Sequence, residues 1–239
     1  MSDFNAPRLF VDDDLPGSIT FDARQTNYLR NVMRLKPGDS IIVFNGRDGE
    51  YRATIDELGK KAGEAVASEK LRAQTRRPSL WYAFAPLKQA RLDYMVEKAA
   101  EMGAGRLVPV LTQHGQVRRI NRERLTANIV EACEQCGILS VPDIVEPVPL
   151  ADFLGSLDGR SLVVADEALA GEEGDAIATI RAAGAPLAVL VGPEGGFSAE
   201  ERALFTPRAS RVSLGPRVLR ADTAAVALLA LVEAAFPSK

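Results

Sequence analysis

The apolar pattern of this chain changes character after residue 78, and that change limits the fold more than any other feature. Before it, short runs of β-branched and aromatic residues are separated by turn dipeptides such as Pro16-Gly17 and Asn45-Gly46. Strands of this kind are typical of a small barrel. After it, continuous apolar runs alternate with helical patterns, as in a parallel sheet covered on both faces. The sequence therefore predicts two domains of different class.

The predicted domains cover residues 1–73 and 74–239, with a basic linker at Lys70–Pro78. In the first domain we predict one helix, Ala23–Leu35, and strands at Arg8–Val11, Ser18–Phe21, Ser40–Phe44, Tyr51–Ile55 and Glu64–Ala67. The period of that helix places four apolar side chains on one side, Tyr28, Leu29, Val32 and Met33, and most of its arginines on the other. In the second domain the predicted strands are Leu80–Ala85, Leu107–Leu111, Leu162–Ala165, Leu187–Val191 and Val212–Leu214. The predicted helices are Gln89–Met102, Arg122–Cys136, Ala199–Phe205 and Thr223–Phe236, the last capped by Asp222 or Thr223.

The composition excludes several protein classes. With 46% hydrophobic and 26% charged residues, the 239-residue chain has enough apolar mass for a core and is neither disordered nor fibrous. Its longest apolar segment, Ala224–Phe236, contains Glu233 and is shorter than the ~18 residues of a membrane span. The first residues lack the layout of a signal peptide, and two cysteines cannot form a disulfide framework. We therefore expect a cytoplasmic protein without membrane contact.

The same counts argue against metal and hydrolase chemistry. A zinc site of the usual type would need His114, both cysteines and a carboxylate, so we predict no metal. A Ser-His-Asp hydrolase would depend on His114, and the chain has no nucleophile-elbow motif. Cys133 and Cys136 have redox spacing but lie inside a helical pattern, which favours unreactive thiols.

The most informative segment follows the predicted strand that ends at Val191. It reads Gly192-Pro193-Glu194-Gly195-Gly196, and a helix then opens at Ser198, which forms a capping-box pair with Glu201. In open α/β sheets, ligands bind beyond the carboxyl ends of the strands, where glycines let the backbone approach them. The segment matches neither Gly-x-Gly-x-x-Gly nor a P-loop. The segment therefore predicts either a loop that binds a ligand other than a nucleotide phosphate, or an ordinary strand-to-helix turn.

A second loop, Leu214–Thr223, also follows a strand and leads into a helix. It carries two apolar side chains, Val218 and Leu219, that follow no strand or helix period. Beside another glycine loop, these could form the walls of a flat apolar slot that suits a purine ring. Two arginines, Arg217 and Arg220, flank this slot, and either could instead be a solvated surface charge.

The two loops together resemble one family. Gly192–Gly196 followed by Leu214–Ala224 is similar to the C-terminal signature of the bacterial 16S ribosomal RNA uracil-N3 methyltransferases, the ribosomal small-subunit methyltransferase E family of the SPOUT superfamily. Pro7–Phe10, Tyr28–Leu35 and Gly38-Asp39 resemble the family's N-terminal barrel. Its central blocks are matched by Pro86–Lys88, Glu97–Gly103 and Glu131–Gly137. The resemblance runs in order along nearly the whole chain.

The resemblance implies an α/β fold, α+β overall, with an N-terminal PUA-like β-barrel and a C-terminal SPOUT α/β domain that contains a deep trefoil knot. Such a knot is a rare exception among folds. It also implies S-adenosylmethionine as cofactor, a homodimer, and 16S ribosomal RNA in the small ribosomal subunit as partner. By the same resemblance, the cofactor site is lined by Leu190, Gly192, Glu194, Gly195, Leu214, Gly215, Val218 and Leu219.

Two residues are candidates for the chemistry. Uracil N3 is a poor nucleophile until its proton leaves, after which negative charge spreads onto the flanking carbonyl oxygens. A guanidinium stabilises such an anion with paired donors, and Arg220 falls on the arginine of the family's Leu-Arg pair. Glu194 is a candidate proton acceptor, with a cofactor-binding or structural role as the favoured alternative.

The net charge of −3 leaves RNA binding open, because a local basic patch suffices. The cations predicted to contact RNA are Arg8, Arg30, Arg34, Lys88 and Arg91. The function predicted from the sequence is thus methylation of N3 of a uridine in 16S ribosomal RNA. Two alternatives remain: a SPOUT enzyme that methylates a ribose 2′-hydroxyl, and a non-catalytic RNA-binding or ribosome assembly protein.

Overall fold

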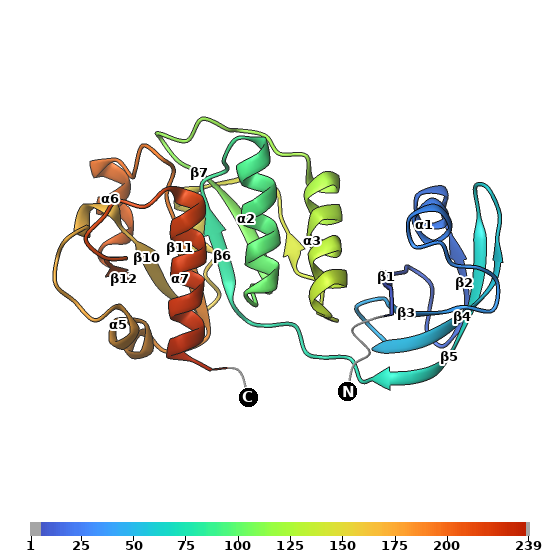
Figure 1. The fold of residues 1–239 in the computed structure, drawn as a ribbon. Helices are drawn as coiled ribbons and strands as arrows, with labels where there is room; N and C mark the ends of the chain where they lie inside the picture. Colours follow the sequence, from blue (N-terminus) through green and yellow to red (C-terminus); the bar gives the residue numbers. More distant parts are fainter. Residues whose placement is uncertain (1–5, 238–239) are drawn as a thin grey trace. The chain divides into compact units, whose positions relative to one another are not determined.

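A computed structural model describes residues 6–237 of the chain, which divide into two compact units (Figure 1). Unit 1 contains the residues up to Arg76 together with Cys133–Val141, and unit 2 contains Arg77–Ala132 and the chain from Pro142 onward. The two units are described separately below. Within the described residues, no helix is long and apolar enough to cross a membrane.

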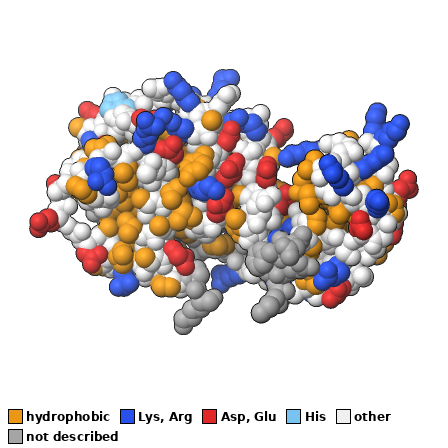
Figure 2. All heavy atoms as spheres, viewed as in Figure 1, with side chains coloured by type: hydrophobic (Ala, Val, Ile, Leu, Met, Phe, Trp, Pro, Cys, Tyr) orange, Lys and Arg blue, Asp and Glu red, His pale blue; other side chains and the backbone are white. Residues whose placement is uncertain are grey.

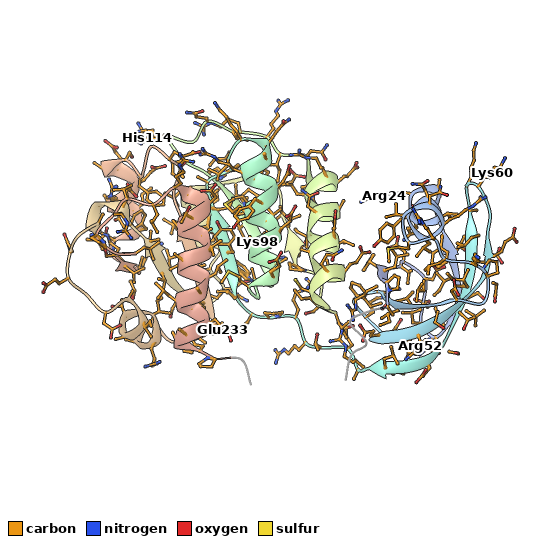
Figure 3. All side chains as sticks on the ribbon, in the orientation of Figure 1. Arg24, Arg52, Lys60, Lys98, His114 and Glu233 are labelled. Atoms are coloured by element: carbon orange, nitrogen blue, oxygen red, sulfur yellow. The ribbon has the colours of Figure 1, made fainter. Side chains whose placement is uncertain are left out.

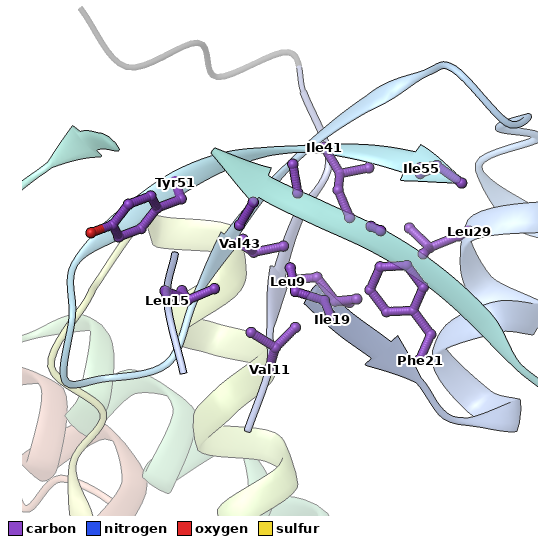
Figure 4. Close-up of a cluster of buried hydrophobic side chains, with 13 residues drawn as sticks. Leu9, Val11, Leu15, Ile19, Phe21, Leu29, Ile41, Val43, Tyr51 and Ile55 are labelled. Carbon is purple, nitrogen blue, oxygen red and sulfur yellow. The ribbon is translucent and has the colours of Figure 1, made fainter. Parts of the chain in front are cut away.

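Unit 1 is built on a five-stranded sheet. Its strands, in spatial order, are β1 (Arg8–Phe10), β3 (Ser40–Phe44), β4 (Glu50–Leu58), β5 (Gly63–Arg72) and β2 (Gly17–Phe21). The pair β1 and β3 is parallel and the other pairs are antiparallel. Alternate residues of these strands point to one side and form a core that includes Leu9, Ile19, Phe21, Ile41 and Ile55 (Figure 4). The predicted strands are confirmed, but β5 continues to Arg72, so the predicted linker began three residues too early.

The predicted helix of unit 1 changes its winding halfway. Helix α1 (Ala23–Asn27) begins at Asp22, which forms a capping box with Gln25, and a π-helical turn, η1 (Tyr28–Val32), follows it. Because the wider π turn shifts the phase of the side chains, Leu29 is buried but Val32 is 62% exposed and Met33 36% exposed. The predicted grouping of Val32 and Met33 with the buried Leu29 on one side of a regular helix is therefore wrong.

A buried ion cluster joins three residues of unit 1. The Glu50 carboxylate, which is fully buried, accepts hydrogen bonds from Arg8 Nε at 2.7 Å and from Arg72 Nε at 2.6 Å. Arg72 Nη2 adds a third bond at 2.7 Å and also donates to the carbonyl oxygen of Gly137 at 2.9 Å. Burial opposes the charged form of Glu50, but the bonds and charges of the two arginines outweigh it and hold its pKa below 4.5.

Unit 2 contains a seven-stranded sheet in which all the pairings are parallel. The order is β12 (Ala209–Val212), β10 (Ser161–Ala165), β11 (Leu187–Val191), β6 (Trp81–Phe84), β7 (Arg106–Leu111) and β8 (Asp143–Ile144), with β9 (Val148–Pro149) paired to β7. The central strands are buried along their whole length. This confirms the α/β class that the continuous apolar runs predicted.

The helices of unit 2 lie against both faces of this sheet. They are α2 (Gln89–Glu101), α3 (Arg122–Cys136, of which the residues from Cys133 onward belong to unit 1), α4 (Leu150–Gly155), α5 (Ala176–Ala183), α6 (Ala199–Phe205) and α7 (Ala221–Ala235), with a short 3₁₀ turn, η2 (Glu167–Leu169). Trp81 and Ala83 of β6 point into a core with α4 and α6, and helices α2 and α5 each contact α7. The four predicted helices are confirmed. Strands β8 and β9, with two residues each, and helices α4 and α5 were not predicted.

Candidate active site

Three segments of unit 2 enclose one pocket. They follow the carboxyl ends of the adjacent parallel strands β10, β11 and β12, which is where open α/β sheets bind ligands. The free space in and in front of the pocket is about 530 Å³, a figure that includes open solvent at its mouth. Its wall is formed by Ala165, Asp166, Glu167, Ala170, Val191, Gly192, Pro193, Glu194, Gly196, Leu214, Gly215, Arg217, Val218, Leu219, Ala221 and Ala224.

Most of the predicted cofactor residues meet in this pocket. Gly192 and Glu194 come from the loop after β11, and Leu214, Gly215, Val218 and Leu219 come from the loop after β12. Within the described part of the chain, the pocket wall includes neither Leu190 nor Gly195. Leu190 is fully buried in the sheet core instead, and its neighbour Val191 reaches the pocket.

The pocket's shape depends on glycine at two positions. Gly196 has φ +69°, and a Cβ there would overlap with the Glu167 carboxylate. A Cβ at Gly192 would lie 2.8 Å from the Phe197 ring. Because these positions have no side chain, the wall presents backbone groups, with apolar Val218 and Leu219 on the other loop. Such a wall fits the predicted cofactor, whose adenine needs apolar contacts and backbone hydrogen bonds.

An acidic segment that the sequence analysis missed forms part of the wall. Asp166 and Glu167 directly follow β10, and the Asp166 carboxylate is fully buried. It pairs with Arg202 Nε at 3.2 Å and with Arg211 Nη2 at 2.7 Å, while Glu167 pairs with Arg202 and accepts from the Phe197 amide at 3.1 Å. These bonds tie η2 to α6 and β12. Their position at the end of a buried strand was the signal that could have identified them.

Arg220 lies at the start of α7, between the pocket residues Leu219 and Ala221. Its backbone occupies the N-cap position, so the predicted N-cap at Asp222 or Thr223 is wrong; Asp222 lies in the first turn. The guanidinium is exposed and has no hydrogen-bond or ion-pair partner among residues 6–237. The guanidinium is therefore free to bond to a substrate.

Glu194 and Asp222 share a cation from helix α2. Arg91 Nη1 lies 3.2 Å from Glu194 Oε1, and Arg91 Nε lies 3.9 Å from Asp222 Oδ2. Arg91 thus links the loop after β11 to the first turn of α7.

The phenol of Tyr82, on strand β6, stays protonated. Burial, with a smaller effect of the Asp222 charge, raises the pKa of Tyr82 well above its usual value.

The other predicted RNA-binding residues lie in different environments. Arg8 belongs to the buried cluster with Glu50, its side chain is 4% exposed, and it presents no free cation to a phosphate. Arg30 is exposed and donates through Nη1 to the Gly59 carbonyl oxygen at 3.0 Å. Arg34 is exposed in a left-handed conformation with φ 58°, and Lys88 is exposed just before α2.

Comparison with known proteins gives consistent matches along the chain. Residues 75–233 match the family described as an RNA methyltransferase domain, and residues 21–67 match an RNA methyltransferase PUA domain. The ribosomal RNA small subunit methyltransferase E of Rickettsia conorii is 32% identical over 208 residues, which cover 86% of this chain and 85% of that protein.

Solved structures share the fold. A putative methyltransferase of Legionella pneumophila, in complex with the bound cofactor SAM, is 28% identical with a TM-score of 0.81 over 97% of this chain and 98% of that chain. The ribosomal RNA small subunit methyltransferase E of Neisseria gonorrhoeae, bound to S-adenosyl methionine, is 22% identical with a TM-score of 0.82. That match covers 96% of this chain and 98% of the other.

Proposed function

This chain belongs to the ribosomal RNA small subunit methyltransferase E family, and from that premise we propose that it transfers a methyl group from S-adenosylmethionine to N3 of a uridine in 16S ribosomal RNA. One observation carries the proposal: the two glycine loops after β11 and β12 line one pocket, and Arg220, which has no side-chain partner among residues 6–237, lies in the chain between two residues of the pocket wall, Leu219 and Ala221. A substrate in the small ribosomal subunit places the reaction in the cytoplasm. Residues 1–73 form the RNA-recognition domain and residues 74–239 the methyltransferase domain, whose knot stays a prediction.

The pocket residues offer two kinds of contact to the cofactor. Backbone groups of Gly192, Gly215 and the residues beside them would bind the polar edges of S-adenosylmethionine, and Val218 and Leu219 would cover its adenine. When bound, the cofactor supplies a methyl group on a sulfonium, which is transferred by in-line displacement. Because such a reaction needs mainly position and charge from the protein, the remaining tasks fall to the charged residues of these two loops.

Arg220 is the proposed catalytic residue. Its guanidinium would donate paired hydrogen bonds to the uracil oxygens and stabilise the anion that forms when the N3 proton leaves. Glu194 is the other candidate for this step. Its carboxylate is paired with Arg91 of helix α2, which supports a role in cofactor binding and loop position over proton acceptance.

The decisive experiment is methyl transfer to small ribosomal subunits from a strain that lacks the gene, with naked 16S RNA in parallel. Mass spectrometry of the nucleosides should find 3-methyluridine. A ribose-methylated product would favour the 2′-O-methyltransferase alternative. Calorimetry with S-adenosylmethionine tests the non-catalytic alternative, because a pure RNA-binding protein should take up none.

Unit 1 offers an exposed basic surface for the RNA, which we define as Arg24, Arg30, Arg34, Lys60 and Lys61. The bond from Arg30 to Gly59 places η1 beside the hairpin between β4 and β5, whose tip carries both lysines. Figure 3 shows Arg24 and Lys60 at the same end of unit 1 and Arg52 at the other. Exposed cations of this kind bind phosphates, and the left-handed backbone of Arg34 and the π turn are uncommon geometries that often occur at functional sites.

Reversal of two charges on this surface should weaken RNA binding. For Arg30→Glu with Arg34→Glu, we expect a lower affinity and a slope of log K against log salt that is smaller by about 1–2, because two phosphate contacts are lost. Arg52→Glu, at the other end of unit 1, is the matched control. Filter binding across a salt series measures both quantities. An unchanged affinity and slope in the double variant would remove this surface from the RNA interface.

Helix α7 supports the proposed homodimer. Its 15 residues include only three that are polar, Asp222, Thr223 and Glu233, so it is apolar on every side. A helix of this kind is normally buried all round, yet Ala230 and Ala234 are exposed and Figure 2 shows hydrophobic side chains gathered over α7. A second copy of the chain would cover this face.

The dimer has a direct test. Sedimentation equilibrium should give twice the chain mass of 25.7 kDa for the wild type. Ala230→Arg should shift it toward the single-chain mass, because the charge would be buried without a partner. Ala182→Arg, on the exposed side of α5, should leave the dimer intact. A single-chain mass for the wild type would contradict the proposal.

A further inference from the structure

The chain's single histidine contacts the glycine loop of the pocket. His114 follows β7 in the turn Thr112–Gly115, which is closed by a bond from the Gly115 amide to the Thr112 carbonyl oxygen at 3.2 Å. The ring reaches the loop after β11, where Nδ1 lies 3.1 Å from the Gly195 carbonyl oxygen and 3.0 Å from that of Gly196. Figure 3 labels this residue in unit 2.

These two partners fix the hydrogen on the ring. A carbonyl oxygen only accepts hydrogen bonds, so Nδ1 must carry the hydrogen and donate it to both oxygens. The neutral imidazole is then the Nδ1–H tautomer, with its lone pair on Nε2. An imidazolium also carries Nδ1–H, so protonation leaves both contacts in place.

Two neighbouring contacts fasten the same segment to the loop. A Cβ at Gly195 would lie 3.0 Å from His114 Cβ and 3.6 Å from its Cγ, so the histidine packs directly on this glycine. The backbone N–H of Gln113 donates to Glu201 Oε1 at 2.7 Å, and the other oxygen of that carboxylate accepts from the backbone N–H of Ser198 at 2.9 Å. The segment Gln113-His114 is therefore bonded both to the glycine turn and to the start of α6.

We propose that His114 is a positioning residue that holds the Gly195–Gly196 turn in the conformation that forms the pocket wall. Glycine has the largest conformational freedom of any residue, and this turn contains two in succession beside Glu194. On the far side, the turn is held by a bond from the Gly196 amide to the Pro193 carbonyl oxygen at 2.9 Å and by the bond from Phe197 to Glu167. On the side that faces the turn Thr112–Gly115, His114 Nδ1 supplies the hydrogen-bond donor to the Gly195 and Gly196 carbonyl oxygens.

Loss of this donor should loosen the turn before any ligand arrives. In His114→Ala, we expect faster amide exchange at Gly196 and Phe197 and an affinity for S-adenosylmethionine that is lower by about tenfold, because binding must then order the turn. His114→Asn places an amide N–H close to the position of Nδ1 and should restore both. Gln113→Ala is the matched control, because Gln113 bonds through its backbone amide.

The measurement of S-adenosylmethionine affinity rests on the proposed function, whereas the amide-exchange and imidazole measurements do not. Amide exchange followed by NMR, and the ¹⁵N resonances of the single imidazole in protein without a histidine tag, need no ligand. The ring of the neutral form should be protonated at Nδ1 and unprotonated at Nε2. The inference is overturned by the opposite tautomer, by unchanged exchange in His114→Ala, or by a folded His114→Asn that behaves like His114→Ala. If the wild type binds no S-adenosylmethionine, the proposed function fails, while exchange and tautomer still decide the role of His114.

Discussion

Replacement of Arg220 by alanine is expected to lower the turnover number by about 10²–10³-fold, the usual effect of losing a donor to a developing anion. The guanidinium has no partner within the described residues, so the free energy of unfolding should change by less than about 0.5 kcal/mol. Arg220→Lys should recover only part of the rate, because an ammonium keeps the charge but loses the planar pair of donors.

Single-turnover methyl transfer and calorimetry with S-adenosylmethionine separate the two roles that Arg220 can have. We expect cofactor affinity close to that of the wild type in Arg220→Ala. The matched control is Arg208→Ala, an exposed arginine in the turn between α6 and β12. Turnover near the wild-type value in Arg220→Ala would exclude Arg220 from the mechanism. Lost cofactor binding with residual chemistry would assign it to the cofactor site.

Glu50→Gln is expected to destabilise unit 1 by about 3–5 kcal/mol, because it leaves two guanidiniums without the buried carboxylate that pairs with both. Glu69→Gln is the matched control. It removes an ion pair with Arg52 in which the side chains are 61% and 36% exposed, and such pairs contribute about 0–1 kcal/mol. Peptide-resolved hydrogen exchange of β4 and β5 measures the effect on unit 1. Fluorescence of Trp81, the single tryptophan, reports on unit 2.

The pH dependence of this effect has a defined sign. The pKa of Glu50 in the folded chain lies below the ordinary value of 4.5, so the wild type should keep its full advantage over Glu50→Gln above about pH 4.5. That advantage should shrink as pH falls below about 4.5 and through the lower folded value, because over this range the unfolded chain binds the proton more readily than the folded protein does. Equal stability of the two proteins at neutral pH would contradict the role given to this cluster.

The sequence predicted the parts of the site that depend on near neighbours. The strand before Gly192, the capping box of Ser198 with Glu201, and the helix that follows the second loop are all found as expected. The error at Val32 arose inside one short helix, where the assumed 3.6-residue period fails in the π turn. The missed strands β8 and β9 are too short to carry a period at all.

The sequence by itself determined the class of each unit and the two loops of the pocket, because strand and helix periods and glycine turns are local properties. Only the tertiary structure decided which charges meet. Arg91 pairs with Glu194 across 103 positions of the chain, and Arg8 pairs with Glu50 across 42. As a result, Arg8 and Arg91, both predicted to contact RNA, bond to carboxylates in the structure, while Arg220 has no side-chain partner among the described residues. A contact between distant residues depends on how the elements pack against one another, and no pattern within either segment records it.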